Sequence, residues 1–579
     1  MNYLIVILFS LFLNFSFAQS TPYELSKGKE TATYQQAIDY YRLLDSTYRE
    51  ITIEEIGITD SGKPLTIIKI TNSISGVNKC RVLINNGIHP GEPEGIDASM
   101  MLARDLLKNK KINKFLDKIE LYIIPIYNIE GSLHRSATSR VNQNGPIEYG
   151  FRGNGQNLDL NRDFIKCDSK NAELFATIFQ KITPHLLIDT HTSNGSNYQY
   201  TLTYVATQKD ELYSPQAVYF ENNLIPAIAN STKSLGFEMI PYVNSRKTIP
   251  NDGIDGFFDS PRYSTGYASL FNCLGFMVET HMLKEFDKRV KATYSFLLSS
   301  IIIASKDAET IIQLQADADT STIFQQEFPI SYSQDTSQFA ELNFKGFTAK
   351  YKESKVSGKP RLFYDESKPI QFPVRFYNEF VPNKIIIKPA AYIIPQAYQK
   401  VIKLLNCNGV EMYELVKDTF LIVESYKIDS FKTFKLPYEG HYYHYQVYTT
   451  ANIDTINYFR GDKVIITNQK TNKYLVETLE PEAKDSFFSW NFFDGVLNQK
   501  EGFSDYVFED VAADMLKKNK TLKDLFEKKK LDDAKFASDG NAQLDYLYKQ
   551  SIYYEKTHNR YPVTRILSES QIPKQILSY

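Results

Sequence analysis

Cysteine, tryptophan and histidine are scarce in this sequence of 579 residues, which contains 4 Cys, 1 Trp and 8 His. The cysteines are Cys80, Cys167, Cys273 and Cys407, and none of them forms a C-x-x-C pair. Neither a cysteine-based zinc cluster nor a dithiol redox motif is therefore indicated. So few cysteines cannot scaffold a chain of this length through disulfides, and their pairing is left open.

The sequence also lacks an excess of charge of either sign. Its 66 basic and 68 acidic residues give a formal charge of −2, so no nucleic-acid partner is expected. We find no repeat of fixed period and no long low-complexity linker. Hydrophobic residues make up 42% of the chain and charged residues 23%, which is typical of a folded protein. The length exceeds what one hydrophobic core organises, so at least two domains are predicted.

One long apolar run, MNYLIVILFSLFLNFSFA, opens the sequence. Small residues at Ser16 and Ala18 fit an export cleavage site that would place the mature start near Gln19. The run is too short to span a bilayer comfortably, so no stable membrane insertion is expected after cleavage. No Lys or Arg precedes it, unlike most export signals, and no Cys follows it for a lipid anchor. We interpret residues 1–18 as a signal peptide, rather than a buried helix, and the protein as secreted or periplasmic.

Residues 35–315 alternate short apolar runs with amphipathic segments. The candidate strands are Arg81–Asn85, Leu121–Ile126, Leu186–Asp189 and Gly275–Glu279, and the candidate helices are Asp97–Leu107, Asn171–Ile182 and Phe286–Ala304. Buried strands separated by helices predict an α/β domain with a mixed, largely parallel sheet flanked by helices.

The sequence changes in character after about residue 320. Residues 320–500 are rich in β-forming side chains separated by turn residues, and they predict a β-rich accessory region. Residues 501–579 are lysine-rich, and their pattern predicts a mostly helical C-terminal segment. His441 and His444 in HYYHY resemble a ligand pair, but the alternating aromatic residues favour packing within a strand.

The most specific feature is the segment NNGIHPGEPEG, in which His89 and Glu92 follow the end of a candidate strand. A hydrolytic zinc site uses three protein ligands of nitrogen or carboxylate type and leaves one position open. A turn at the end of a strand can direct both side chains toward one point. The H-x-x-E spacing is weak on its own, because a neighbouring His and Glu often form only a surface pair.

A third candidate ligand, His191, lies in LLIDTHT at the end of another buried strand. His185 lies at the start of the same strand, so we expect it at the opposite edge of the sheet. His134 and His281 remain as competitors. His281 follows Glu279 by two residues and could support the site without binding the metal.

Two further segments carry charged groups suited to catalysis. In LDLNRDF, Asn161 and Arg162 place an amide beside a guanidinium, a pair suited to a terminal carboxylate, although Arg162 could instead pair with Asp159 or Asp163. In FMVETH, Glu279 closes an apolar run, so burial is expected to raise its pKa. Such a carboxylate suits a general base.

Taken in order, HPGE, the R-x-N of RGN, LDLNRDF, DTH and VETH resemble the zinc carboxypeptidase family, the carboxypeptidase A-like metallopeptidases. The resemblance covers roughly residues 35–310. It implies that His89, Glu92 and His191 bind one Zn²⁺ per chain and that Glu279 activates the attacking water. The implied partner is a peptide substrate with a free C-terminus.

The same resemblance implies roles for neighbouring residues. Asn161 and Arg162 would hold the C-terminal carboxylate of the substrate. Arg152 would stabilise the oxyanion, and Asp159 would orient His89.

Two of these assignments have rivals. Arg140 competes with Arg152 for the oxyanion role, and Tyr267 competes with Tyr263 as the tyrosine that caps the substrate. The spacing from Tyr263 to Glu279 is shorter than the family pattern, so this loop is expected to differ. The side-chain preference of the enzyme is left open.

These features predict an exported zinc metallocarboxypeptidase. Two alternatives stand beside it. One is a zinc amidase or deacylase that acts on peptidoglycan stem peptides or small N-acyl substrates, and the other is a catalytically silent binding protein on the same fold.

Overall fold

The computed structural model describes residues 19–74 and 76–578. The predicted signal peptide, residues 1–18, lies outside the described residues. Within the described residues, no helix is both long enough and apolar enough to cross a membrane. The four cysteines are unpaired, and three of them are buried.

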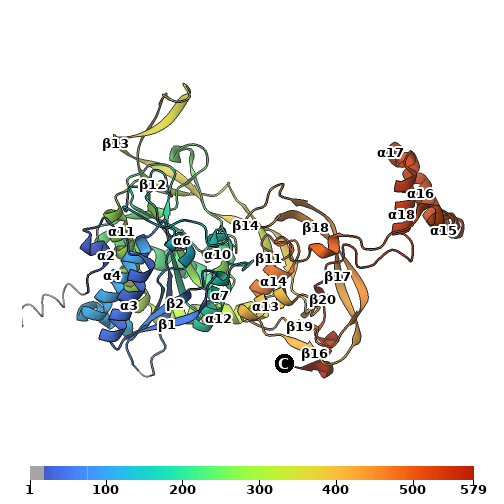
Figure 1. The fold of residues 1–579 in the computed structure, drawn as a ribbon, viewed down its shortest axis with the longest axis horizontal. Helices are drawn as coiled ribbons and strands as arrows, with labels where there is room; N and C mark the ends of the chain where they lie inside the picture. The colour runs from blue at the N-terminus through green and yellow to red at the C-terminus, as the bar shows by residue number, and fades with distance from the viewer. Residues whose placement is uncertain (1–18, 75, 579) are drawn as a thin grey trace, which may run out of the picture.

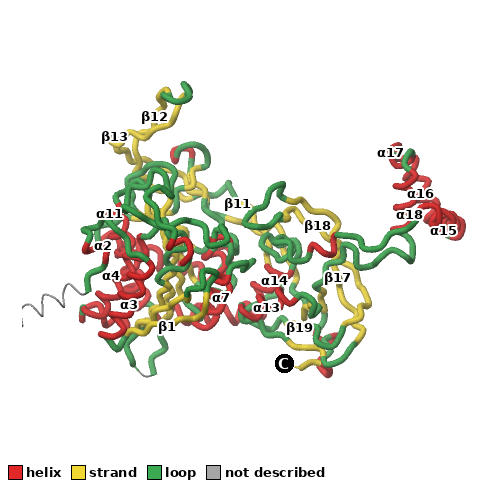
Figure 2. Tube along the Cα trace, viewed as in Figure 1, coloured by secondary structure: helices red, strands yellow, loops and turns green. Residues whose placement is uncertain are grey.

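An eight-stranded mixed sheet forms the centre of the N-terminal part (Figures 1 and 2). Its strands, in spatial order, are β1 (Ile51–Ile58), β2 (Pro64–Ile70), β4 (Ile119–Ile124), β3 (Cys80–Asn85), β5 (Leu186–Ser193), β10 (Leu274–His281), β6 (Leu202–Ala206) and β7 (Met239–Pro241). The four central strands, from β4 to β10, run parallel. Their side chains are nearly all buried, as expected for parallel strands covered on both faces.

Helices pack on both sides of this sheet, with α3, α4 and α11 on one side and α7 on the other (Figures 1 and 2). The helices of this part are α2 (Pro22–Leu25), α3 (Tyr34–Thr47), α4 (Glu94–Lys108), α5 (Lys110–Asn113), α6 (Ile129–Leu133), α7 (Lys170–Ile182), α8 (Ser214–Tyr219), α9 (Ile225–Ser234), α10 (Ser264–Ser269), α11 (Phe286–Lys306) and α12 (Ala308–Phe324). Apolar residues at helical spacing in α4, among them Ile96, Met100 and Ala103, are buried. The predicted flanked α/β sheet is confirmed.

The strand-rich C-terminal part is built on a seven-stranded antiparallel sheet. Its strands, in spatial order, are β18 (His444–Tyr458), β17 (Thr419–Thr433), β20 (Thr564–Ile566), β15 (Ala391–Ile394), β19 (Lys463–Ile466), β16 (Tyr413–Leu415) and β21 (Leu577–Ser578). Two helices, α13 (Gln399–Cys407) and α14 (Asn472–Leu479), accompany this sheet.

A two-stranded antiparallel sheet and a hairpin come between the two large sheets in the sequence. β11 (Glu327–Gln334) pairs with β14 (Phe380–Ile387), and β12 (Ala340–Glu353) pairs with β13 (Pro360–Tyr377). The base of the β12–β13 hairpin joins two short strands of the N-terminal part, β8 (Asn244–Ser245) and β9 (Ile254–Asp255). Its tip projects from the body of the molecule (Figure 1).

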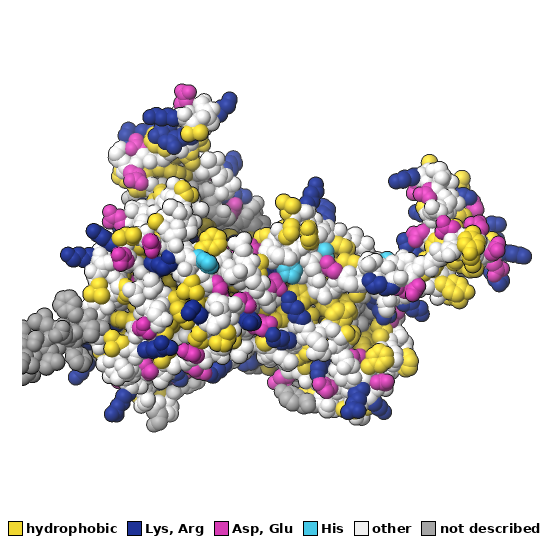
Figure 3. All heavy atoms as spheres, viewed as in Figure 1, with side chains coloured by type: hydrophobic (Ala, Val, Ile, Leu, Met, Phe, Trp, Pro, Cys, Tyr) yellow, Lys and Arg dark blue, Asp and Glu magenta, His cyan; other side chains and the backbone are white. Residues whose placement is uncertain are grey.

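The last helices form a separate projecting cluster (Figure 1). They are α15 (Asp505–Lys518), α16 (Lys520–Asp532), α17 (Ala534–Ala537) and α18 (Gly540–Lys549). The chain then returns to the seven-stranded sheet as β20 and β21, so helices fill only part of the C-terminal segment. Basic and acidic side chains are interspersed over the face drawn in Figure 3, in keeping with the small net charge.

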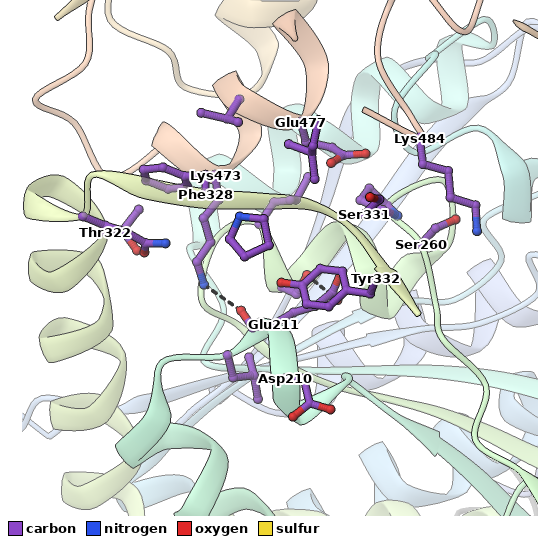
Figure 4. Close-up of a pocket in the computed structure, with 18 of the residues that line it drawn as sticks. Asp210, Glu211, Ser260, Thr322, Phe328, Ser331, Tyr332, Lys473, Glu477 and Lys484 are labelled. Atoms are coloured by element: carbon purple, nitrogen blue, oxygen red, sulfur yellow. Dashed lines mark hydrogen bonds between the residues drawn. The ribbon is translucent and has the colours of Figure 1, made fainter. Parts of the chain in front are cut away.

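A cavity of about 230 Å³ lies where the N-terminal and strand-rich parts meet (Figure 4). Ser260 and Glu211 line it from one part, and Glu477 and Lys473 of α14 line it from the other. The Lys473 ammonium donates to the Glu211 carbonyl at 3.1 Å. The two parts therefore share polar contacts as well as apolar packing.

Candidate metal centre and active site

Strand register brings the candidate site residues of β5 and β10 together. The two strands are parallel neighbours, and His191 is directly paired with Glu279. Paired residues on adjacent strands point to the same face of a sheet. β5 and β10 extend to Ser193 and His281, so His191 and Glu279 lie inside the strands rather than at their ends. The predicted strands end at Asp189 and Glu279. Polar residues beyond these ends continue the pairing of β5 with β10, for example Thr280 with Thr192.

His89 and Glu92 lie in the turn between β3 and α4, as predicted. The Glu92 N–H donates to the His89 carbonyl at 2.8 Å, which closes this turn. Gly87 has a φ of +67°, which L side chains rarely adopt. At Gly95, an added Cβ would lie 2.0 Å from the Thr190 hydroxyl of β5, so glycine permits the close approach of α4 to the sheet.

His89, Glu92 and His191 form a compact buried donor set. Each offers one ligand atom within 4.8 Å of the others, and it is the one group of this kind found among the described residues. His191 Nδ1 lies 3.1 Å from His89 Nδ1 and 3.1 Å from Glu92 Oε2. All three residues are 3% exposed.

The second nitrogen of each imidazole is held by a carboxylate. His89 Nε2 lies 2.9 Å from Asp159 Oδ1, and His191 Nε2 lies 2.8 Å from Asp189 Oδ2. With a proton at each Nε2, the Nδ1 lone pairs face each other and Glu92, an arrangement that requires a positive charge between them. These donor types and this orientation fit Zn²⁺.

The electrostatics of the donor set point the same way. Burial alone would lower the pKa of His191, but Asp189 and Glu92 raise it well above its usual value. Burial would raise the pKa of Glu92, but Arg140 and His89 hold it well below its usual value. The site therefore favours an ionised carboxylate together with a bound positive charge.

Glu279 lies beside this donor set with one oxygen available. Burial raises its pKa to about 8, and although His191 opposes the rise, Glu92 adds to it. Its Oε2 has no hydrogen-bond partner among the described residues. A carboxylate of raised pKa that is not committed to a protein donor suits proton transfer.

Two arginines enter the same pocket with different neighbours. Arg152 donates from Nε to Asp159 at 2.9 Å, and its Nη1 lies 3.3 Å from His89 Nδ1. Arg140 is less exposed, contacts Glu92 and donates to the Thr192 carbonyl at 2.8 Å. The structure thus keeps both sequence-predicted candidates within one cavity.

Arg162 and Tyr263 also meet at this cavity. The guanidinium of Arg162 lies over the Tyr263 ring at 4.3 Å, and its Nη1 donates to the Asn161 carbonyl at 2.8 Å. The ion pair with Asp159 is loose, at 3.9 Å. Asp163 is engaged instead by Lys166, 2.7 Å away, so a tight surface pair does not account for Arg162.

A cavity of about 370 Å³ joins these groups. All the sequence-predicted site residues line it: His89, Glu92, Arg152, Asn161, Arg162, His191, Tyr263 and Glu279. Arg140 lines it too. One part of the wall is uncharged and formed by Val205, Tyr242, Phe257 and Met277.

Comparison with known proteins agrees with this geometry. Residues 37–204 match the family described as zinc carboxypeptidase. This segment belongs to the zinc carboxypeptidase family. It contains the three metal donors and the Asn161–Arg162 pair, whereas Tyr263 and Glu279 lie beyond it.

Several carboxypeptidases resemble more of the chain. Carboxypeptidase 2 of Trichophyton rubrum is 21% identical over 514 residues, covering 80% of this chain and 85% of that protein. Carboxypeptidase 2 of Trichophyton tonsurans is 22% identical over 455 residues, covering 71% and 74%. The crystal structure of a metallo-carboxypeptidase from Burkholderia cenocepacia is 16% identical, covering 48% of this chain and 70% of that one, with a TM-score of 0.38.

The sequence interpretation of the site missed two groups of residues. Asp189 lies two residues before His191, and alternate residues of a strand share a face, so the D-x-H pattern could have identified it. The uncharged wall residues left no comparable signal. Val205 and Tyr242 come from elements that only the folded chain brings to Glu279.

Tyr267, the rival of Tyr263, lies in the core. Its side chain is fully buried, its hydroxyl donates to Asn408 at 2.6 Å, and its ring packs against Phe179 and Phe271. It does not line the cavity that contains Tyr263 and Glu279.

The other histidines lie away from the metal donors. His185 precedes β5, and its Nδ1 accepts from the Arg81 N–H at 2.9 Å. His134 is exposed. His281 contacts the Ser196 carbonyl at 3.0 Å instead of a metal donor, so its expected supporting role is not seen.

The two histidines of HYYHY do not act as a pair. His441 lies 2.7 Å from Asp168, and His444 lies 3.0 Å from Asp494. Their ring contacts with aromatic residues agree with packing, but only His444 lies in a strand, at the start of β18, and His441 precedes that strand.

The loop before α10 contains the buried carboxyl group of Asp259. We expect this group to make the stability of the folded protein depend on pH. Asp259 is 1% exposed, and burial raises its pKa from 3.8 to about 8. Between these values the folded protein holds a proton that the unfolded chain has released, so this group lowers the free energy of unfolding as pH rises toward 8. The slope is up to about 1.4 kcal/mol per pH unit.

Asp259→Asn mimics the protonated side chain and removes this dependence. We expect the melting temperature of the variant, relative to wild type, to increase steadily from pH 5 to pH 8. Asp252→Asn, at an exposed position nearby, is the matched control and should follow wild type. A constant difference between Asp259→Asn and wild type across this range would contradict the prediction.

Proposed function

We propose that the protein is an exported zinc metallocarboxypeptidase that hydrolyses the C-terminal peptide bond of its substrate. One observation carries the proposal. A single cavity contains the His89, Glu92 and His191 donors, the Glu279 carboxylate, and the Asn161–Arg162 pair. Metal donors and a base suit hydrolysis, while the amide and guanidinium suit a free terminal carboxylate. The apolar residues 1–18 support export.

The fit of the donor set supports zinc as the metal. Bound by His89, Glu92 and His191, zinc supplies a Lewis acid that acidifies water and polarises a carbonyl. Asp159 and Asp189 hold the two imidazoles in the tautomer that presents Nδ1 to the metal.

The chain's own residues supply the proton transfers and the remaining charge. Glu279 accepts a proton from the attacking water and returns it to the leaving amine, which its raised pKa permits. Arg152 stabilises negative charge on the carbonyl oxygen. Arg140, the rival candidate, lines the same cavity and lowers the pKa of Glu279, so it is also placed to offset negative charge there.

Other residues of the same cavity serve substrate recognition. Asn161 and Arg162 bind the C-terminal carboxylate, and Tyr263, stacked on Arg162, covers the bound residue. The uncharged wall that includes Val205 and Met277 supports an apolar or aromatic C-terminal side chain.

A peptide panel tests this function. The peptides differ only in their C-terminal residue, which is Phe, Lys or Glu, and the Phe peptide is also made as its amide. We expect release of the C-terminal residue, fastest for Phe, with at least a tenfold lower kcat/KM for the amide, because a charge-assisted pair is lost. Mass spectrometry identifies the cleavage end.

Arg162→Ala should remove most of this preference for the free carboxylate. Arg361→Ala, at an exposed position on β13, is the matched control. Equal cleavage of the acid and the amide by wild type would favour the amidase or deacylase alternative. Stoichiometric zinc without any cleavage would favour the silent binding protein.

A further inference from the structure

A turn of the strand-rich part lies directly against the carboxylate-binding segment of the catalytic domain. This turn, residues 434–443, connects β17 to β18. The Tyr438 hydroxyl accepts a hydrogen bond from Arg162 Nε at 3.1 Å. Glu439 Oε2 accepts one from the Asp159 N–H at 2.7 Å. Both contacts join residues more than 270 positions apart in the sequence.

The contact with Tyr438 fixes how Arg162 presents its guanidinium. Nε is bound to Tyr438, Nη1 is bound to the Asn161 carbonyl, and the Tyr263 ring covers one face. Nη2 has no hydrogen-bond partner in the part of the chain that the structure describes. Three constraints therefore leave one nitrogen for a ligand in the cavity that Arg162 lines.

The turn itself is held firmly. The Tyr438 ring stacks on Trp490, the single tryptophan of the chain, with centroids 6.1 Å apart and planes at 19°. Arg262 lies over the Trp490 ring at 4.8 Å and is paired with Asp485 at 2.9 Å. A side chain anchored in this way can orient its partner at little cost in side-chain entropy.

Glu439 extends the contact toward the metal donors. It accepts from the backbone of Asp159, whose carboxylate binds both His89 and Arg152. The strand-rich part thus fixes the backbone of a residue that orients a metal donor.

We propose that Tyr438 and Glu439 are positioning residues that complete the substrate-carboxylate site from outside the catalytic domain. The inference rests on the proposed carboxypeptidase function. It assigns the strand-rich part a role in substrate binding: Tyr438 holds Arg162 in the orientation that meets the terminal carboxylate, and Glu439 holds the segment that carries Arg162.

Tyr438→Phe tests the proposal, because it removes the hydroxyl and keeps the stacked ring. Tyr443→Phe is the matched control: its ring also packs on Trp490, but its hydroxyl donates to the Lys484 carbonyl and not to Arg162. Kinetics are measured for a peptide ending in Phe and for its amide, together with zinc content and melting temperature. We expect Tyr438→Phe to raise KM for the acid about tenfold, with kcat, zinc content and amide cleavage nearly unchanged.

Glu439→Ala provides a second variant, which removes the acceptor for the Asp159 N–H, and it should also weaken binding of the acid more than that of the amide. An unchanged KM in Tyr438→Phe, or an equal rise in Tyr443→Phe, would overturn the proposal. The proposed function fails separately, when wild type itself does not distinguish acid from amide. If wild type cleaves the acid better than the amide, and Tyr438→Phe behaves like wild type, only the positioning role is rejected.

Discussion

Replacing Glu279 by glutamine should abolish peptide hydrolysis while the protein remains folded and loaded with zinc. Of the two carboxylates that line the cavity, Glu92 and Glu279, only Glu279 has a raised pKa, and its Oε2 has no hydrogen-bond partner among the described residues. Glutamine keeps the size of the side chain but cannot accept and return a proton. Loss of a positioned general base lowers kcat by about 10²–10⁴-fold. Because the metal donors are other residues, zinc content and KM should change little.

Glu211→Gln is the matched control for this prediction. Burial also raises the pKa of Glu211 to about 8, but the residue lines the cavity between the two parts and not the active site. Steady-state kinetics and metal analysis of both variants separate proton transfer from a general effect of removing a buried carboxylate. Turnover by Glu279→Gln at the wild-type rate would exclude the assigned base. A comparable loss in Glu211→Gln would show that the effect is not local.

The metal-binding part of the site could be predicted from sequence because each donor is tied to a local pattern. His89 and Glu92 share one turn, and His191 belongs to a strand whose apolar residues mark it as buried. Parallel strands bring their carboxyl-terminal ends to the same edge, so such patterns converge without further information. The same reasoning correctly predicted a helix over Asn171–Ile182, which is α7 in the structure, and a strand over Arg81–Asn85, which is β3.

Contacts made across long separations could not be predicted in this way. Nothing near Arg162 in the sequence indicates that Tyr438 binds its Nε, since a single hydrogen bond leaves no periodic pattern. Tyr263 and Tyr267 lie four residues apart, yet one lines the cavity and the other is fully buried. Their separation depends on how the start of α10 meets the core, which a spacing rule does not determine.

The return of the chain to the seven-stranded sheet illustrates the same limit. The lysine-rich pattern predicted helices, and α15, α16 and α18 are present. β20 is only three residues long, Thr564–Ile566, too short to show a strand period of its own. It is held by pairing with β15 and β17, which lie far earlier in the chain.

His191→Ala should remove the metal as well as the activity. His89 and Glu92 remain, but the imidazole of His191 is replaced by a methyl group, and a site with two ligands no longer holds zinc firmly. We expect bound zinc to fall from about one per chain to near zero after dialysis, measured by mass spectrometry of the metal. Asp189, fully buried, also loses one of its two side-chain partners and keeps only the Ser264 hydroxyl, so a lower melting temperature is expected.

A graded series separates metal binding from folding in this prediction. Asp189→Asn keeps all three donors and loses only the charge that orients His191, so zinc affinity should fall by about 10–100-fold without complete loss. His134→Ala changes an exposed histidine of the same domain and should bind zinc like wild type. The expected order of affinity is wild type equal to His134→Ala, then Asp189→Asn, then His191→Ala. Full zinc occupancy in a folded His191→Ala variant would show that the metal, if bound, is held by a different set of residues.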